Sequence, residues 1–288
     1  MKRNVTKIVV MTFFKTVCMV IAAGAFLLMS AKDVYAAAPA NVVDLIIFAG
    51  QSNMSGNGGD ASKAPKVPTG HGYEYRAVTA PNTLMPLAEP FGRGEKGYIC
   101  DFEQYQNGTL VSSFVNAYYD ATGVPVIAVP CTRGGTDSAF WANSAASSEV
   151  LSRFTKAKSY LEKNGFTIRR KYLVFLQGES DSVAGTPAYQ YRMNLVTAFQ
   201  PLFANGLEQV FLITPGYAAN GMFNYDDIVK AQLDLCEQSP LFSLGSAVLH
   251  TLPTTYLKDA VHYNQEALNL AGQSAGLNAA VFTNGGMK

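Results

Sequence analysis

The stretch from Val42 to Gly56, VVDLIIFAGQSNMSG, constrains the fold more than any other part of the chain. Residues 42–48 are apolar except for one Asp and are β-branched at four positions, a pattern typical of a strand buried on both faces of a parallel sheet. The apolar run ends at Gly50, and small and polar residues then predict a turn. Open α/β sheets bind ligands at the carboxyl ends of their strands. Ser52, just past such an end, is therefore the candidate nucleophile.

Apolar runs and helical periodicities alternate along the rest of the chain. Further strands are expected at residues 124–129, 171–176, 209–214 and 246–252, and helices at 110–121, 147–164, 186–203, 225–237 and 264–282. This alternation predicts an α/β fold, a three-layer α/β/α sandwich around a mostly parallel five-stranded sheet. Residues 60–108, which are rich in Pro and Gly, are expected to form a long irregular region over the cleft.

The first 36 residues differ from the remainder. Met1 to Lys7 is basic, Thr16 to Met29 is apolar, and small residues end the segment at Ala36, which predicts a signal peptide cleaved after Ala36 and a secreted protein. A retained membrane anchor is the alternative, although Lys15 interrupts the apolar stretch. Residues 37–288 show no composition shift and are expected to form one domain.

Charge and composition exclude several classes of function. The segment 1–36 holds five basic residues and one acidic one, against 22 Lys plus Arg and 21 Asp plus Glu in the whole chain, so the remaining domain is slightly acidic. We therefore expect no nucleic-acid partner, and no stable membrane association once the signal is cleaved. With three His residues and no paired Cys motif, neither a metal site nor a cofactor is expected.

The disulfide state is open at this point. The predicted domain contains Cys100, Cys131 and Cys236, an odd number. One bridge with one free thiol, and three buried thiols, both fit an exported protein.

Three later segments fall just after predicted strand ends. Gly134 and Gly135 follow the second strand, and paired glycines let backbone N–H groups approach a ligand closely. Gln177, after the third strand, carries an amide that can donate to a developing oxyanion, and Glu179 is a carboxylate at the same sheet edge. Asp259 precedes His262 by three residues near the end of the chain.

A serine hydroxyl needs a base to take its proton and a third group to orient that base. Ser52, His262 and Asp259 supply these three types, with Asp259 close enough in sequence to reach the His262 Nδ1 atom. The oxyanion hole is predicted to comprise the N–H groups of Ser52 and Gly135, or Gly134, with the Gln177 side chain. The alternative interpretation of each segment is an ordinary polar turn.

Four other residues or motifs carry competing interpretations. Residues 272–276, GQSAG, match a nucleophile-elbow motif but lie inside a predicted helix rather than after a strand. Ser180 follows a strand but lacks small neighbours. Trp141 could line a sugar-binding cleft or be buried in the core. His250 is interpreted as a buried structural histidine on the fifth strand.

The chain resembles the SGNH-hydrolase superfamily and, within it, the sialate O-acetylesterases and acetylxylan esterases. The resemblance rests on four segments: Gly50–Gly56, Gly134–Trp141, Gln177–Asp181 and Asp259–His262. It implies a flavodoxin-like SGNH fold, no metal, and hydrolysis of acetyl esters on sugars, with Ser52 as nucleophile and His262 as base oriented by Asp259. The resemblance also implies that Gly135 and Gln177 donate hydrogen bonds to the oxyanion.

Residues beside these, Gln51, Asn53, Gly134 and Glu179, are expected to support the site. The chain departs from the family pattern at Ala260, where Gly is common, and at Phe175-Leu176, since an aromatic usually precedes the Gln directly; both bear on substrate preference. An acetylated glycan is the expected partner. A non-catalytic glycan-binding module and a lipase or thioesterase for longer acyl chains are the alternative functions.

Overall fold

The computed structural model describes residues 41–286, and the predicted signal segment lies outside these residues. The strands are β1 (Val42–Gly50), β2 (Gly72–Arg76), β3 (Ala80–Pro86), β4 (Val126–Thr132), β5 (Thr167–Leu176), β6 (Gln209–Ile213) and β7 (Phe242–Ser246). The α-helices are α2 (Ser52–Ser55), α3 (Val111–Thr122), α4 (Ser138–Ala142), α5 (Ser144–Lys163), α6 (Glu179–Ala184), α7 (Ala188–Ala204), α8 (Asp226–Gln238) and α9 (Gln265–Thr283).

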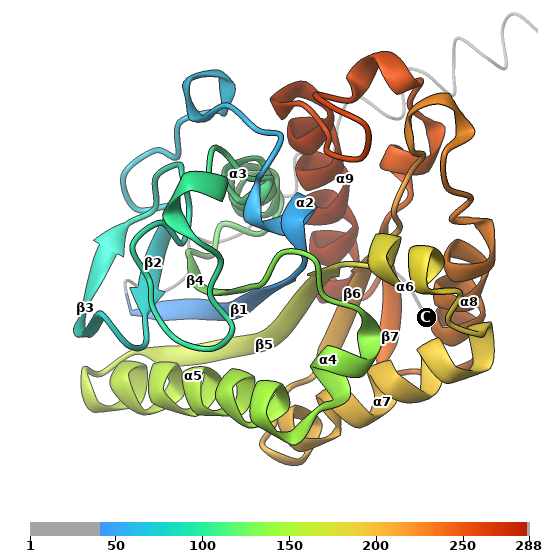
Figure 1. Ribbon diagram of the computed structural model, residues 1–288. Helices are drawn as coiled ribbons and strands as arrows, with labels where there is room; N and C mark the ends of the chain where they lie inside the picture. The colour runs from blue at the N-terminus through green and yellow to red at the C-terminus, as the bar shows by residue number, and fades with distance from the viewer. Residues whose placement is uncertain (1–40, 287–288) are drawn as a thin grey trace, which may run out of the picture. The chain divides into compact units, whose positions relative to one another are not determined.

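The strands form one sheet in the order β3-β2-β4-β1-β5-β6-β7. β1 lies at its centre, paired in parallel with β4 and β5, and among the strand pairs of residues 41–286 only β2–β3 is antiparallel. Every residue of β1 from Val43 to Gly50 is buried, as expected of a strand covered on both faces. The carboxyl ends of β1, β4 and β5 therefore lie side by side at one edge of the sheet, next to α2 (Figure 1).

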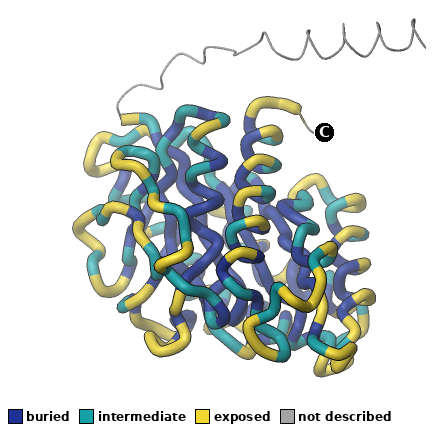
Figure 2. The backbone as a smooth tube through the Cα atoms, turned by 90° about the horizontal axis from the view of Figure 1, so that it is seen from above, coloured by how far each residue is buried: buried dark blue, intermediate teal, exposed yellow. Residues whose placement is uncertain are grey.

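Helices cover both faces of the sheet. Ile47 and Ala49 of β1 pack in one core cluster with α5, α7 and α8, whereas Ile46 and Phe48 pack in a second cluster with α3 and α9. The buried strands run between helices whose exposed residues face outward (Figure 2). The predicted three-layer α/β/α sandwich is thus confirmed.

The GQSAG motif lies inside α9, as predicted, and its two glycines allow close packing of this helix. A Cβ atom at Gly272 would lie 2.2 Å from the Leu110 carbonyl oxygen, and one at Gly276 would lie 2.4 Å from that of Phe114. Glycine at both positions lets α9 approach α3 closely. The motif is therefore not a nucleophile elbow.

The prediction of five strands is wrong, because the sheet has seven. β2 and β3 lie within the region expected to be irregular. β3 (APNTLMP) is mostly exposed and has Pro as its second and last residues, as edge strands can, so it lacks the apolar pattern of a buried strand. The last strand is Phe242–Ser246, not 246–252. Its sequence FSLGS is weakly apolar, and the more apolar residues after it form a 3₁₀ turn, Val248–Thr251.

Cys100, Cys131 and Cys236 are all free thiols. Cys100 and Cys131 are buried, and burial raises the thiol pKa of Cys100 to about 11 and that of Cys131 to about 12. The fold therefore has three thiols and no bridge among these cysteines, and Cys236 is only partly buried. Within residues 41–286, no helix combines the length and apolarity needed to cross a membrane.

Candidate active site

Ser52 is the first residue of α2, directly beyond the end of β1. The turn between them depends on Gly50, whose φ is +144° and whose Cβ, if present, would lie 2.0 Å from the Leu176 carbonyl oxygen. Ser52 is 7% exposed. Because the first residues of a helix have no intrahelical acceptor, its backbone N–H is left without a partner among the described residues.

The Gly134–Gly135 loop lies beside this turn, because the Arg133 N–H donates to the Gly50 carbonyl oxygen at 2.9 Å. The Gly134 N–H is already used, since it donates to Asp101 Oδ2 at 3.1 Å. Gly135 has a φ of +71° and open space around its Cβ position, and its N–H has no acceptor in the described part of the chain. The structure therefore offers the Gly135 N–H, and not that of Gly134, as a free donor.

Asp259 holds His262 by both its side chain and its backbone. Its Oδ2 atom lies 2.8 Å from His262 Nδ1, and its Oδ1 atom accepts from the N–H groups of Val261 and His262 at 2.9 Å each. Partial burial acts to raise the pKa of Asp259, but these hydrogen bonds outweigh it and hold the pKa below its ordinary value. Ionised Asp259 thus fixes the imidazole and leaves Nε2 unbonded among the described residues.

Asn53 joins the nucleophile turn to the His262 loop. Its Nδ2 donates to the Val261 carbonyl oxygen at 3.2 Å, and its Oδ1 accepts from the Tyr263 N–H at 3.0 Å. The residue after Ser52 is therefore bonded to both residues that flank His262. No hydrogen bond between Ser52 Oγ and the imidazole occurs in residues 41–286; catalytic hydrogen bonds commonly tighten only when substrate is bound.

Gly58 packs closely against the His262 loop, a contact that the sequence did not reveal. A Cβ atom there would lie 2.2 Å from the Tyr263 carbonyl oxygen and 2.9 Å from His262 Cβ. The absence of a side chain lets the His262 loop pack directly on the turn after α2. The sequence marks Gly58 only as one of several small residues, because the His262 loop is about 200 residues away in the chain.

Glu179 lies in the first turn of α6 and is 5% exposed. One carboxylate oxygen accepts from Asn53 Nδ2 at 2.7 Å. Burial raises its pKa, against the smaller opposing effects of the Asn53 hydrogen bond and the nearby His262. Gln51 reaches the same turn, because its side-chain amide lies 3.3 Å from the backbone nitrogens of Gly178 and Ser180.

Gln177 is fully buried beside the Gly135 loop. Its Nε2 donates to Asp181 Oδ2 at 2.5 Å, to the Thr136 carbonyl oxygen at 3.1 Å and to Gln51 Oε1 at 3.3 Å. Asp181 also accepts from the Ser138 hydroxyl at 2.6 Å. The Gln177 amide thus lies between the nucleophile turn and the Gly135 loop, but Asp181 holds it, and its role as an oxyanion donor stays a prediction.

The structure decides the interpretations of Trp141 and His250. Trp141 is 1% exposed, donates to Thr136 Oγ1 at 3.1 Å and packs on Phe175, so it belongs to the core. The prediction that His250 is a buried strand residue is wrong: it lies in the 3₁₀ turn after β7, partly exposed, and stacks on Tyr217. The apolar neighbours that suggested burial belong to the turn, in which Leu249 alone is buried.

Metal ligands do not gather in this region. Within residues 41–286, no group of three or more His, Cys, Asp or Glu side chains is placed to hold a metal ion. The site consists of a serine, a carboxylate-oriented imidazole and free backbone N–H groups, which are the parts required for acyl transfer.

Comparison with known protein families gives a match over most of the chain. Residues 42–279 match the family model described as carbohydrate esterase, sialic acid-specific acetylesterase. Among curated protein sequences, none matches the chain significantly.

Solved structures share the fold at low sequence identity. A protein from Arabidopsis thaliana aligns with a TM-score of 0.61 at 21% identity, covering 85% of this chain and 99% of its own. NanS aligns with a TM-score of 0.56 at 13% identity, covering 84% and 97%. A carbohydrate acetylesterase from Xanthomonas citri aligns with a TM-score of 0.55 at 16% identity, covering 84% of this chain and 56% of its own. At these identities the likeness shows the fold alone.

Proposed function

Because the chain belongs to the carbohydrate esterase family described as sialic acid-specific acetylesterases, we propose that it removes O-acetyl groups from a glycan through an acetyl-enzyme. Family membership makes the protein a carboxylic ester hydrolase. The observation that carries the catalytic part of the proposal is the link from Asn53 to Val261 and Tyr263, since it brings His262 to the turn that bears Ser52.

In the first half-reaction, Ser52 Oγ attacks the acetyl carbonyl carbon while His262 Nε2 takes the hydroxyl proton. The carbonyl oxygen becomes an oxyanion, stabilised by the N–H groups of Ser52 and Gly135 with the Gln177 amide as third donor. The tetrahedral intermediate then breaks its bond to the sugar oxygen, which leaves with the proton from His262. Asp259 keeps the imidazole in the required tautomer and stabilises its cationic form.

In the second half-reaction, water attacks the acetyl group on Ser52 and gives a proton to His262 Nε2. Collapse of this second intermediate returns the proton from His262 to Ser52 Oγ and releases acetic acid, which ionises to acetate in water. No step requires a metal or a cofactor. The proposed reactants are an acetylated glycan and water.

The supporting residues act through position. Asn53 holds the His262 loop, Glu179 holds Asn53, and Gln51 ties the nucleophile turn to the segment before α6. Gly134 anchors its loop on Asp101, which leaves the next N–H free for the oxyanion.

We propose that the enzyme acts outside the cytoplasm, because the basic and apolar pattern of residues 1–36 is that of a signal peptide. Comparing the mass of the protein in the medium or periplasm with that of the full chain tests this. A mass that still includes the first 36 residues would contradict cleavage after Ala36.

The Ser52→Ala variant tests the chemistry. We expect it to lose hydrolysis of 4-nitrophenyl acetate and of acetylated xylan and O-acetyl sialosides, while circular dichroism and thermal unfolding stay as in the wild type. Retained turnover in this variant would exclude Ser52 as nucleophile. A rate that rises with acyl chain length on synthetic esters would instead favour a lipase or thioesterase.

A further inference from the structure

Residues 101–107 are attached at both ends to the two backbone segments that flank Ser52. At one end, Asp101 accepts from the Gly134 N–H at 3.1 Å. At the other, Asn107 donates from its backbone N–H to the Gly56 carbonyl oxygen at 3.2 Å and from its Nδ2 to that of Asn57 at 2.9 Å. Because it runs from the Gly135 loop to the end of α2, this segment forms a wall of the candidate site.

This wall exposes two aromatic side chains. Phe102 is 55% exposed and Tyr105 is 48% exposed, and their ring centroids lie 6.3 Å apart in an edge-to-face arrangement. Single exposed aromatics are common on protein surfaces, but these two rings contact each other. Phe102 also directly follows Asp101, the residue that holds the Gly135 loop.

Arg133 completes the cluster from the Gly135 loop itself. Its Cζ atom lies 5.1 Å from the centroid of Phe102, a cation–π distance, and its Nη1 donates to the Cys100 carbonyl oxygen at 3.0 Å. No carboxylate pairs with Arg133 within 4.0 Å in the described residues, so its remaining N–H groups are open to another acceptor.

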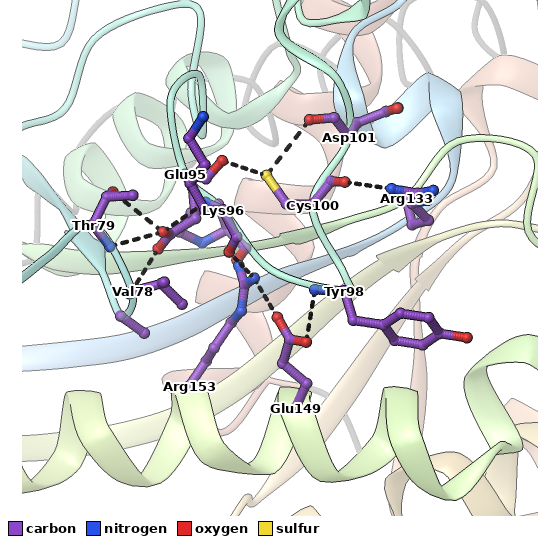
Figure 3. Close-up of polar contacts among 12 residues, drawn as sticks. Val78, Thr79, Glu95, Lys96, Tyr98, Cys100, Asp101, Arg133, Glu149 and Arg153 are labelled. Carbon is purple, nitrogen blue, oxygen red and sulfur yellow. Dashed lines mark hydrogen bonds and ion pairs between the residues drawn. The ribbon is translucent and has the colours of Figure 1, made fainter.

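The chain just before the wall is firmly held (Figure 3). Arg153, which is 1% exposed, donates to the carbonyl oxygens of Lys96 and Pro130 at 2.7 Å each. Glu149 accepts from the Tyr98 N–H at 2.8 Å, and Cys100 Sγ donates to the Glu95 carbonyl oxygen at 2.8 Å. Because the backbone that carries Phe102 and Tyr105 is held in this way, little conformational entropy is lost when their rings bind a ligand.

We propose that Phe102, Tyr105 and Arg133 form the subsite for the pyranose ring that carries the acetyl ester, a proposal that rests on the proposed function. The C–H groups of a sugar ring are weakly positive and pack on the negative face of an aromatic ring. Arg133 covers one face of Phe102 and donates to the sugar's oxygen atoms. Binding energy gained on the sugar then raises kcat/KM for glycan esters over simple esters.

The test measures the ratio of kcat/KM for a sugar ester to kcat/KM for 4-nitrophenyl acetate. The sugar probes are monoacetylated methyl xylopyranoside and an O-acetylated methyl sialoside. We expect Phe102→Ala and Tyr105→Ala to lower this ratio about 10-fold each, and the double variant to lower it further. Phe102→Leu, which keeps an apolar side chain without an aromatic face, should lower it as Phe102→Ala does.

Tyr189→Ala is the matched control, because Tyr189 is a 63% exposed aromatic on α7 outside this wall; its ratio should equal that of the wild type. An unchanged ratio in the folded Phe102/Tyr105 double variant would overturn the subsite while leaving the esterase intact. Failure of the wild type to hydrolyse any acetyl ester would overturn the proposed function, and the subsite with it.

Discussion

Gly58→Ala places one methyl group where the His262 loop now lies. The new Cβ would be 2.2 Å from the Tyr263 carbonyl oxygen, about 1 Å short of ordinary contact, and 2.9 Å from His262 Cβ. The clash involves backbone, which cannot rotate away as a long side chain can. The His262 loop must therefore move by about 1 Å relative to Ser52, a displacement that can reduce a rate by about 100-fold.

The assay is kcat for 4-nitrophenyl acetate, with thermal unfolding measured in parallel. Gly276→Ala is the matched control, because its Cβ would meet the Phe114 carbonyl oxygen at a comparable 2.4 Å, but between α9 and α3. We expect both variants to be destabilised and only Gly58→Ala to lose about 100-fold in kcat. Wild-type kcat in a folded Gly58→Ala variant would refute the argument that close packing at Gly58 positions His262.

Three further predictions concern the polar residues around Ser52. Asn53→Asp cannot donate to Glu179 or to the Val261 carbonyl oxygen. We expect its free energy of unfolding to fall by about 2–4 kcal/mol and its kcat to fall about 100-fold. Wild-type kcat in this variant would contradict a positioning role for Asn53. Gln177→Ala should lower kcat about 100-fold if the amide is an oxyanion donor, whereas a loss of stability with unchanged kcat would make Gln177 purely structural. Burial raises the pKa of the Glu179 carboxyl in the folded protein. The unfolded chain releases this proton above about pH 4.3, whereas the folded protein keeps it. The free energy of unfolding should therefore fall as the pH rises from about 4.3 to the raised pKa. In Glu179→Gln, the free energy of unfolding measured in urea should depend less on pH over this range. An unchanged pH dependence in this variant would contradict a raised pKa of Glu179.

The central half of the fold could be predicted from the sequence because burial on both faces imposes a strong pattern. β1, β4, β6 and the second half of β5 appear in the sequence as predominantly apolar runs, and each predicted boundary lies within a few residues of the observed one. β2 and β3 could not be found in this way, since an edge pair that is partly exposed needs no apolar run. The apolar run near His250 was misleading because a single buried Leu249 anchors a turn there.

The sequence indicated which types of residue form the candidate site, but it did not indicate which of several similar groups has a free hydrogen-bond donor. Gly134 and Gly135 are equivalent in the sequence, and only the Asp101 side chain, about 30 residues away, distinguishes them by taking the Gly134 N–H. The Gln177 amide was expected to face the substrate, yet it donates to Asp181 four residues later. Hydrogen-bond partners that compete for the same donor cannot be ranked without coordinates.

Three of the four residues from Gly50 to Asn53 contact other segments of the chain, and the fourth is Ser52. Gly50 has no side chain because the Leu176 carbonyl oxygen of β5 occupies the Cβ position. The Gln51 side-chain amide contacts the backbone just beyond β5, and Asn53 bonds to Val261 and Tyr263, the residues on either side of His262 in the sequence. The segment therefore fixes three chain regions around Ser52 as well as presenting the hydroxyl. This is why a substitution at any of its four positions should impair catalysis, including the three that do not react with substrate.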